Sequence, residues 1–196
     1  MSRLILASTS PRRAELLRQI GVDFVQRAVE TDESPHPGEV SAETALRLAR
    51  SKAEAGVRLA TTSAQIVLAA DTLVSFENEA LGKPRNRDDF IAVMQRLSGR
   101  QHEVYTAVAL AQADEMRAFL SISHVCFRPL RDAEIIAYWG TGEPADKAGG
   151  YAIQGLAGAF ITRLEGSYSG VMGLPLFETA ELLRHAGIPI WEAGIA

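Results

Sequence analysis

Residues 4–17, with the sequence LILASTSPRRAELL, decide how the beginning of the chain folds. The stretch starts as an apolar strand, bends at hydroxyl side chains and continues as a helix with two arginines in its first turn. Ser10 is a typical helix N-cap, Pro11 suits the first helical position, and Gly21 suits the residue after a helix end. We therefore expect a helix from Pro11 to about Ile20.

The start of this helix is a candidate anion site. Arg12 and Arg13 lie at the positive end of the helix dipole, where each cation is disfavoured by roughly 0.3–1 kcal/mol. A phosphate would offset this cost, because backbone N–H groups, two guanidinium groups and the hydroxyls of Ser8, Thr9 and Ser10 would converge on it. The alternative is that the arginines point into solvent and the serines only cap the helix.

The composition is that of one ordinary globular domain. The chain has 196 residues, 47% of them hydrophobic and 22% charged, and no linker divides it, so we expect a single domain over residues 1–196. No apolar run approaches the roughly 18 residues of a membrane span, and the net charge of −4 argues against a nucleic-acid partner. A single cysteine, Cys126, excludes an internal disulfide and predicts a reduced, cytoplasmic setting.

Three lysines are unusual because this chain otherwise uses arginine. Of the 20 basic residues only Lys52, Lys83 and Lys147 are lysines, which indicates positions where a compact ammonium fits better than a planar guanidinium. Lys52 falls on the inward apolar stripe of a helix expected from a Ser41 cap to about Gly56. Its ammonium either extends to the rim or points into a cleft. Lys83 stands in a rigid Gly-Lys-Pro loop.

The glycine-rich segment 143–158, EPADKAGGYAIQGLAG, is typical of a shaped ligand loop rather than a linker. Lys147 stands before two glycines of this segment, and Gln154 follows them.

Acidic residues at two places in the chain are candidates for chemistry. Asp71 interrupts the buried apolar strand expected over residues 65–74, where a carboxylate is costly unless it has a partner, a metal ion or a proton to handle. The alternative is a structural aspartate that accepts hydrogen bonds from backbone N–H groups. Asp32 and Glu33 are the candidates in an acidic loop over residues 29–39, where simple solvation is the alternative.

The remaining periodicity predicts further elements of a mixed α/β protein. Asp88 or Asp89 is expected to cap a helix. Two long stretches, 101–111 and 116–128, alternate and are rich in β-branched residues, which favours an antiparallel pair. The last helix is expected to bury Phe177 among its apolar residues.

Together these features indicate a triphosphate site. The basic groups would hold the phosphates, Asp71 and Glu33 would hold a divalent cation, and a water activated by the metal and Asp71 would attack phosphorus in line. The chain lacks both the G-x-x-x-x-G-K-[ST] and the G-x-G-x-x-G patterns, so it is neither a P-loop enzyme nor a Rossmann dinucleotide-binding protein. Leu73 stands where an aspartyl-phosphate phosphatase would carry a second aspartate.

Six blocks in the order of the chain carry a resemblance to a known family. They are LASTSPRRAELL (6–17), AADTLV (69–74), GKP (82–84), TAV (106–108), DKAGGYAIQG (146–155) and GSYSGVMGLP (166–175). As a set they resemble the Maf family of nucleotide pyrophosphatases. The resemblance implies a mixed sheet flanked by helices, with two lobes around a central cleft, similar to the inosine triphosphatase architecture. It also implies hydrolysis between the α and β phosphates of a nucleoside triphosphate with Mg²⁺ or Mn²⁺.

The resemblance also assigns roles by position. Asp71 is similar to the family's catalytic carboxylate and Glu33 to a second acidic group near the metal. The residues implied to contact phosphates or the transition state, or to bind substrate, are Ser8, Ser10, Arg12, Arg13, Lys52, Thr72, Lys83, Lys147 and Gln154.

Substrate choice follows from three of these positions. Arg12, Thr72 and Gln154 match the specificity residues of the dTTP/UTP branch, whereas the branch that acts on 7-methyl-GTP has an aromatic residue in place of Arg12. Gly170 departs from the family, where asparagine is common. Family analogy also makes a homodimer plausible and leaves a second hypothesis open, a nucleotide-binding regulator of septum formation that acts through a protein partner.

Overall fold

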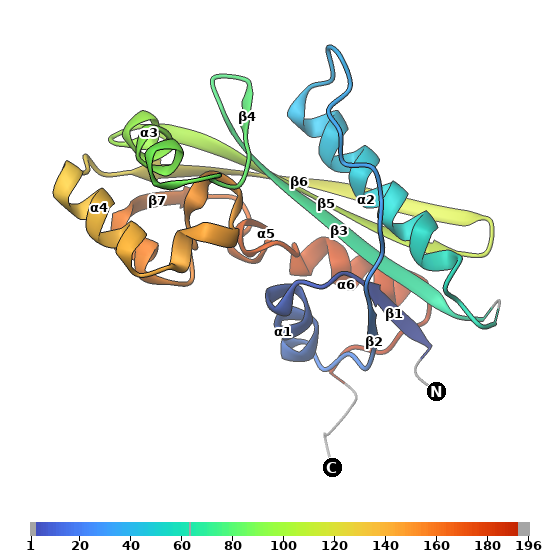
Figure 1. Ribbon diagram of the computed structural model, residues 1–196. Helices are drawn as coiled ribbons and strands as arrows, with labels where there is room; N and C mark the ends of the chain where they lie inside the picture. Colours follow the sequence, from blue (N-terminus) through green and yellow to red (C-terminus); the bar gives the residue numbers. More distant parts are fainter. Residues whose placement is uncertain (1–2, 63, 192–196) are drawn as a thin grey trace.

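A mixed β-sheet with helices on both faces forms the frame of the protein, which confirms the expected fold class (Figure 1). The computed structural model describes residues 3–62 and 64–191. The strands are β1 (Leu4–Ala7), β2 (Val25–Arg27), β3 (Ile66–Phe76), β4 (Glu79–Leu81), β5 (Gln101–Gln112), β6 (Glu115–Phe127) and β7 (Ile161–Glu165). The α-helices are α1 (Pro11–Gln19), α2 (Ser41–Val57), α3 (Arg87–Leu97), α4 (Asp132–Gly140), α5 (Tyr168–Met172) and α6 (Leu176–His185). The glycine-rich segment contains the 3-10 helices η1 (Glu143–Asp146), η2 (Ala148–Gly150) and η3 (Leu156–Phe160). In this part of the chain no helix is both long and apolar enough to cross a membrane.

β3 is the strand at which parallel and antiparallel pairing meet. In the order β2-β1-β3-β5-β6-β7, β1 is parallel to both β2 and β3, while the pairs β3–β5, β5–β6 and β6–β7 are antiparallel. The expected antiparallel pair of long strands is confirmed as β5 and β6, which turn at Ala113 and Asp114. β4 folds back antiparallel on the end of β3.

One edge of β3 contains a gap that positions the site. β1 pairs with β3 as far as Leu68, and β4 begins to pair with it at Val74. The described strands therefore leave this edge open over residues 69–73, whereas β5 continues along the opposite edge. Asp71 and Thr72 lie in the gap, and because successive side chains of a strand alternate, they point to opposite faces of the sheet.

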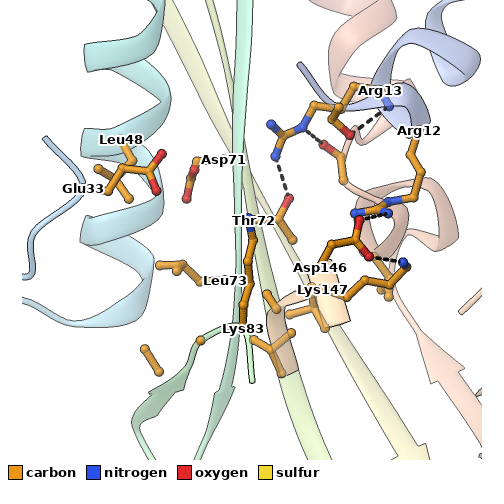
Figure 2. A pocket seen from close by; sticks show the side chains of 18 of the residues that line it. Arg12, Arg13, Glu33, Leu48, Asp71, Thr72, Leu73, Lys83, Asp146 and Lys147 are labelled. Atoms are coloured by element: carbon orange, nitrogen blue, oxygen red, sulfur yellow. Dashed lines mark hydrogen bonds and ion pairs between the residues drawn. The ribbon is translucent and has the colours of Figure 1, made fainter. Parts of the chain in front are cut away.

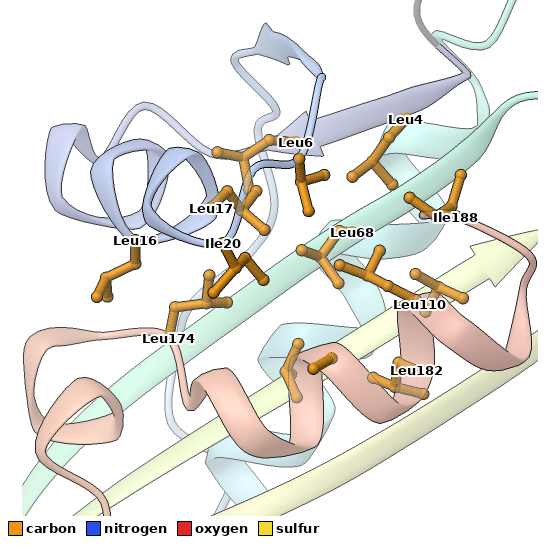
Figure 3. Packing of buried hydrophobic residues seen from close by; sticks show 14 of the residues in the cluster. Leu4, Leu6, Leu16, Leu17, Ile20, Leu68, Leu110, Leu174, Leu182 and Ile188 are labelled. Atoms are coloured by element: carbon orange, nitrogen blue, oxygen red, sulfur yellow. The ribbon is translucent and has the colours of Figure 1, made fainter. Parts of the chain in front are cut away.

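The two faces of the sheet are covered by different kinds of side chain. On one face α1 and α6 pack against β1, β3 and β5 through large apolar residues, which include Leu4, Leu6, Leu17, Leu68, Leu110, Leu182 and Ile188 (Figure 3). On the other face α2 packs through small residues, which include Ala45, Ala49, Ala53, Ala69, Ala107 and Ala109. The small side chains let α2 approach the sheet closely, since a Cβ on Gly56 would lie 2.5 Å from Cγ1 of Val67.

A second packing region covers the other end of the sheet. There α3 and α4 pack against β3, β5 and β6 through Val74, Phe90, Met94, Leu97, Val104, Phe127, Ile135 and Tyr138. The long strands are thus shared between two lobes, and the gap in the edge of β3 falls where one region gives way to the other.

Two helices begin differently from the expectation. Val40 is the N-cap of α2, and Ser41 is its first residue. The N-cap of α3 is Asn86, whose Oδ1 accepts a hydrogen bond from the backbone N–H of Asp89 at 2.9 Å, so the prediction of a cap at Asp88 or Asp89 was wrong. Both aspartates instead lie in the first turn, where the helix dipole favours negative charge.

The prediction that Phe177 is buried was also wrong. Its side chain is 75% exposed, whereas Thr179, Ala180, Leu182 and Leu183 form the buried side of α6. Phe177 lies on the same side of α6 as the exposed Glu181 and Arg184, four and seven residues later, so the orientation of the helix on the sheet overrides its hydrophobicity.

Candidate active site

All but one of the candidate residues named from the sequence line one cleft, of about 830 Å³, at the gap in the sheet. The exception is Asp32, whose Oδ1 accepts a hydrogen bond from the backbone N–H of Ser34 at 2.9 Å. The candidates in the cleft are Ser8, Ser10, Arg12, Arg13, Glu33, Lys52, Asp71, Thr72, Lys83, Lys147 and Gln154. They come from the start of α1, the loop after β2, α2, β3, the loop after β4 and the glycine-rich segment. Segments that are far apart in the sequence therefore meet around the open edge of β3.

Asp71 points toward α2 and has a charged partner there. The residue is only 6% exposed, and its Oδ1 accepts a hydrogen bond from Nζ of Lys52 at 2.6 Å. The same Nζ lies 2.6 Å from Oε1 of Glu33, which faces Asp71 beside α2 (Figure 2). The Lys52 ammonium therefore points into the cleft and not to the rim, and it supplies the partner that a buried carboxylate requires.

Thr72 points to the other face, where it contacts Arg13. The guanidinium of Arg13 donates from Nε to the carbonyl of Gly173 at 2.8 Å, from Nη1 to Oγ of Ser8 at 3.3 Å and from Nη2 to Oγ1 of Thr72 at 3.3 Å (Figure 2). Burial lowers the pKa of Arg13 below its ordinary value, while the nearby charge of Asp71 acts to raise it. Arg13 is therefore held inside the cleft by neutral acceptors, not directed into solvent.

The start of α1 forms as the sequence predicts. Oγ of Ser10 accepts a hydrogen bond from the backbone N–H of Arg13, which confirms Ser10 as the N-cap. Oγ of the buried Ser8 accepts a further bond from the backbone N–H of Ser10 at 3.1 Å. Ser8 thus joins the helix start to the Arg13 guanidinium, and the hydroxyl-rich bend and the arginine form one polar unit.

Asp146 connects two of the predicted cations. Its Oδ2 lies 3.7 Å from Nη1 of Arg12, and its Oδ1 accepts a short hydrogen bond from Nζ of Lys147 (Figure 2). The bond from Lys147 lowers the pKa of Asp146 below its ordinary value. The Asp146 side chain is 68% exposed, so an incoming phosphate can compete with it for both cations.

Lys83 and Gln154 are exposed where they line the cleft, but their loops are fixed. The backbone N–H of Gly149 donates to the carbonyl of Gly82 at 3.0 Å, which fastens the Lys83 loop to the glycine-rich segment. Gly149 has a φ of 66°, and a Cβ there would lie 2.9 Å from Cγ1 of Val74. Only glycine fits this approach of the segment to β3.

Thr106 supports the site, although its role was missed in the sequence. It is fully buried on β5 directly opposite Thr72, and its hydroxyl donates to the carbonyl of Gly170 at 2.8 Å. Since a hydroxyl has one proton, Thr106 accepts the hydrogen bond from Thr72 at 3.1 Å. The TAV motif contains this threonine, but nothing in the motif indicates a buried partner. Gly170 is the third residue of α5, and its backbone N–H donates to Oγ of Ser167 at 2.9 Å.

Asp71 and Glu33 have the chemistry to hold a divalent cation together with substrate. The two carboxylates converge on the ammonium of Lys52. Among residues 3–62 and 64–191, no three or more His, Cys, Asp or Glu side chains gather as a metal site. Mg²⁺ needs only one or two protein carboxylates when phosphates and waters supply its other ligands. The pair therefore fits a cation that binds with the phosphates.

Comparison with known proteins shows which family this chain resembles. The model of the Maf-like proteins matches residues 3–186. Proteins named dTTP/UTP pyrophosphatase from Pseudoalteromonas translucida, Aromatoleum aromaticum and Methylobacillus flagellatus are 50%, 50% and 51% identical to this chain. In the same order, the matches cover 91%, 96% and 97% of this chain and 94%, 98% and 96% of the three proteins. A solved structure of the Staphylococcus aureus Ham1 protein matches with a TM-score of 0.45 and 14% identity, over 63% of this chain and 71% of that one. Because the family model and the three dTTP/UTP pyrophosphatases match nearly the whole sequence, the chain belongs to the Maf family.

Proposed function

We propose that the protein is a nucleoside triphosphate pyrophosphatase that hydrolyses dTTP and UTP to the nucleoside monophosphate and pyrophosphate. The observation that carries the proposal is the convergence of Arg12, Arg13, Lys52, Lys83 and Lys147 on a cleft that also holds the buried Asp71. The names of the curated relatives, dTTP/UTP pyrophosphatase, support the same activity.

The basic residues form a binding site for a triphosphate. Arg13 uses one N–H on each of its nitrogens within the protein, and a guanidinium has five N–H donors. Two donors therefore remain for phosphate oxygens, in the bidentate geometry that arginine favours. Lys147 and Arg12 share the carboxylate of Asp146 and can exchange it for phosphate.

Asp71 is the proposed catalytic base. It would take a proton from a water molecule while the water oxygen bonds to the α-phosphorus. The bond from this phosphorus to the oxygen that bridges the α and β phosphates would break, and pyrophosphate would leave with that oxygen. Asp71 and Glu33 would hold Mg²⁺ or Mn²⁺, which when bound stabilises phosphate charge and lowers the pKa of a water ligand. The Lys52 ammonium contacts both carboxylates, and it could exchange them for phosphate oxygens when the triphosphate binds.

Gln154 is the residue that we propose to select the nucleobase of the substrate. Its amide is exposed in the cleft and offers both donors and an acceptor, as the edge of uracil or thymine requires. Thr72 acts differently, because its hydroxyl already accepts from Arg13 and donates to Thr106. Its influence on substrate choice would pass through the position of Arg13.

Pyrophosphate release by the purified protein tests the proposal. The assay uses dTTP, UTP, CTP, GTP and 7-methyl-GTP, each with Mg²⁺ and with Mn²⁺, and we expect dTTP and UTP to be preferred. A preference for 7-methyl-GTP would keep the reaction and overturn the substrate assignment. Binding of dTTP without pyrophosphate release from any nucleotide would overturn the enzyme and favour the nucleotide-binding regulator.

A further inference from the structure

The glycine-rich segment brings Lys147 and Gln154 to the cleft. The carboxylate that bonds to the backbone of this segment belongs to Glu143, which lies outside the cleft lining. Glu143 is the first residue of η1 and is not among the residues that line the cleft. Its carboxylate is enclosed by the backbone of the same segment, since a Cβ on Gly155 would collide with it. The function proposed above gives no role to this carboxylate.

Glu143 accepts hydrogen bonds on both carboxylate oxygens. Oε1 accepts from the hydroxyl of Tyr138 at 2.6 Å and from the backbone N–H of Ala157 at 3.5 Å. Oε2 accepts from the backbone N–H of Leu156 at 3.1 Å. The Tyr138 hydroxyl in turn accepts from the backbone N–H of Ala152 at 3.2 Å.

These bonds hold the chain on both sides of Gln154. Ala152 lies two residues before it, and Leu156 and Ala157 lie two and three residues after it. The backbone carbonyl of Glu143 also accepts a hydrogen bond from Nζ of Lys147 at 2.9 Å. Glu143 is therefore connected to Lys147 and, directly or through Tyr138, to the backbone on both sides of Gln154.

We propose that Glu143 and Tyr138 are positioning residues that set nucleobase selection, because they fix the backbone that carries Gln154 and orient Lys147. The proposal rests on the pyrophosphatase function proposed above and adds residues to the same site. Tyr138 is suited to this role because its ring is buried and contacts Phe90 and Phe160, with ring centroids 6.0 and 5.2 Å away. The hydroxyl therefore projects from a rigid core.

The role requires a carboxylate rather than any polar side chain. All three groups that face it are donors, so glutamine would turn an NH₂ group toward a backbone N–H and leave one donor unpaired. Burial acts to raise the pKa of Glu143, but the hydrogen bonds from Tyr138 and from the backbone of Leu156 and Ala157 outweigh it and leave the pKa below its ordinary value. Glu143 is thus held as the anion.

Steady-state kinetics of Glu143→Gln and Tyr138→Phe test the proposal. The readout is the ratio of kcat/KM for dTTP to kcat/KM for CTP, and we expect the ratio to fall about tenfold in Glu143→Gln and less in Tyr138→Phe. Glu134→Gln is the matched control, because Glu134 accepts hydrogen bonds from Arg128 and Arg131 outside the cleft. Its ratio should not change. If Glu143→Gln does not fold, Tyr138→Phe alone decides.

A double-mutant cycle separates positioning from general destabilisation. If Glu143 acts through Gln154, then Glu143→Gln should lower the dTTP/CTP ratio little further in a Gln154→Ala background. Equal loss on both nucleotides in each Glu143 and Tyr138 variant, or additive effects with Gln154→Ala, would overturn the proposal.

Binding measurements keep this test independent of turnover. The Kd values of the α,β-imido analogues of dTTP and CTP, measured by calorimetry, should show the same reduced discrimination in Glu143→Gln. If the wild-type protein releases no pyrophosphate, the pyrophosphatase assignment fails, and these Kd values still decide the role of Glu143. Unchanged discrimination in both binding and turnover would show that Glu143 and Tyr138 are only structural.

Discussion

The two faces of β3 at Asp71 and Thr72 differ in how their charged side chains are paired. On the α2 face charges meet charges, since Lys52 Nζ lies 2.6 Å from carboxylate oxygens of both Asp71 and Glu33. On the α1 face a guanidinium meets neutral oxygens, since Arg13 donates to two hydroxyls and a backbone carbonyl. Two residues that are adjacent in the sequence thus belong to sites of different character.

This difference separates two tasks of one cleft. Neutral acceptors orient Arg13 without cancelling its charge, so that face is prepared to bind an anion. The Lys52 ammonium and its two carboxylates can exchange partners when a divalent cation or a phosphate binds, so the α2 face is suited to the hydrolysis step. Mutations on the α2 face should therefore reduce kcat, and mutations on the α1 face should reduce kcat/KM through binding.

The largest effect is expected from Asp71→Asn. Asparagine keeps the shape but cannot take a proton or hold a cation as well, so kcat should fall about 10²–10⁴-fold while nucleotide binding persists. Pyrophosphate release and thermal unfolding are the measurements. Asp114→Asn, in the β5–β6 turn, is the control for loss of a carboxylate outside the cleft. Wild-type turnover in Asp71→Asn would remove Asp71 from the chemistry.

Arg13→Ala should have the next largest effect. Loss of charge-assisted hydrogen bonds worth about 1.5–3 kcal/mol should reduce kcat/KM by roughly 10–150-fold. Arg13→Lys should recover little, because an ammonium cannot match three separate acceptors and two phosphate contacts. Arg18→Ala, on the same helix but stacked on Phe24, should behave as wild type. A lysine variant with full activity would contradict the geometric role of the guanidinium.

Thr72→Val isolates the neutral contact on the α1 face. The variant keeps the β-branched shape and removes one acceptor of Arg13, so kcat/KM should fall about tenfold or less, mostly through KM. Thr72→Ser retains the hydroxyl and should stay close to wild type. If Thr72→Val lowers kcat alone, the division of tasks between the two faces is wrong.

The smallest effect is expected from Lys83→Ala. Lys83 is an exposed residue of the loop after β4, so water and salt screen its charge where it lines the cleft. We expect KM for dTTP to rise about two- to fivefold at low salt and the difference from wild type to shrink at about 0.5 M salt. An effect as large as that of Arg13→Ala, and independent of salt, would place Lys83 in direct contact with the transition state.

Much of the local structure could be predicted from the sequence. Ser10, Pro11 and Gly21 mark the ends of α1 through short-range rules, and the apolar run around Asp71 marks a strand covered on both faces. The residue types at the cleft could be predicted in the same way. The cap of α3 could not, because Asn86 and Asp89 are both competent caps and the backbone path decides between them.

The residues that could serve a triphosphate site were recognisable in the sequence, because charge, hydroxyl and glycine content are properties of single residues and short motifs. How these residues meet depends on the tertiary structure. The open edge of β3 depends on where β1 stops and β4 starts, and the contact of Lys52 with Asp71 depends on the close approach of α2. The buried carboxylate of Glu143 behind Gln154 is likewise a long-range result. The pairing of strands and the packing of a helix on a sheet bring together residues that are far apart in the sequence, so these contacts form only when the chain has closed around its core.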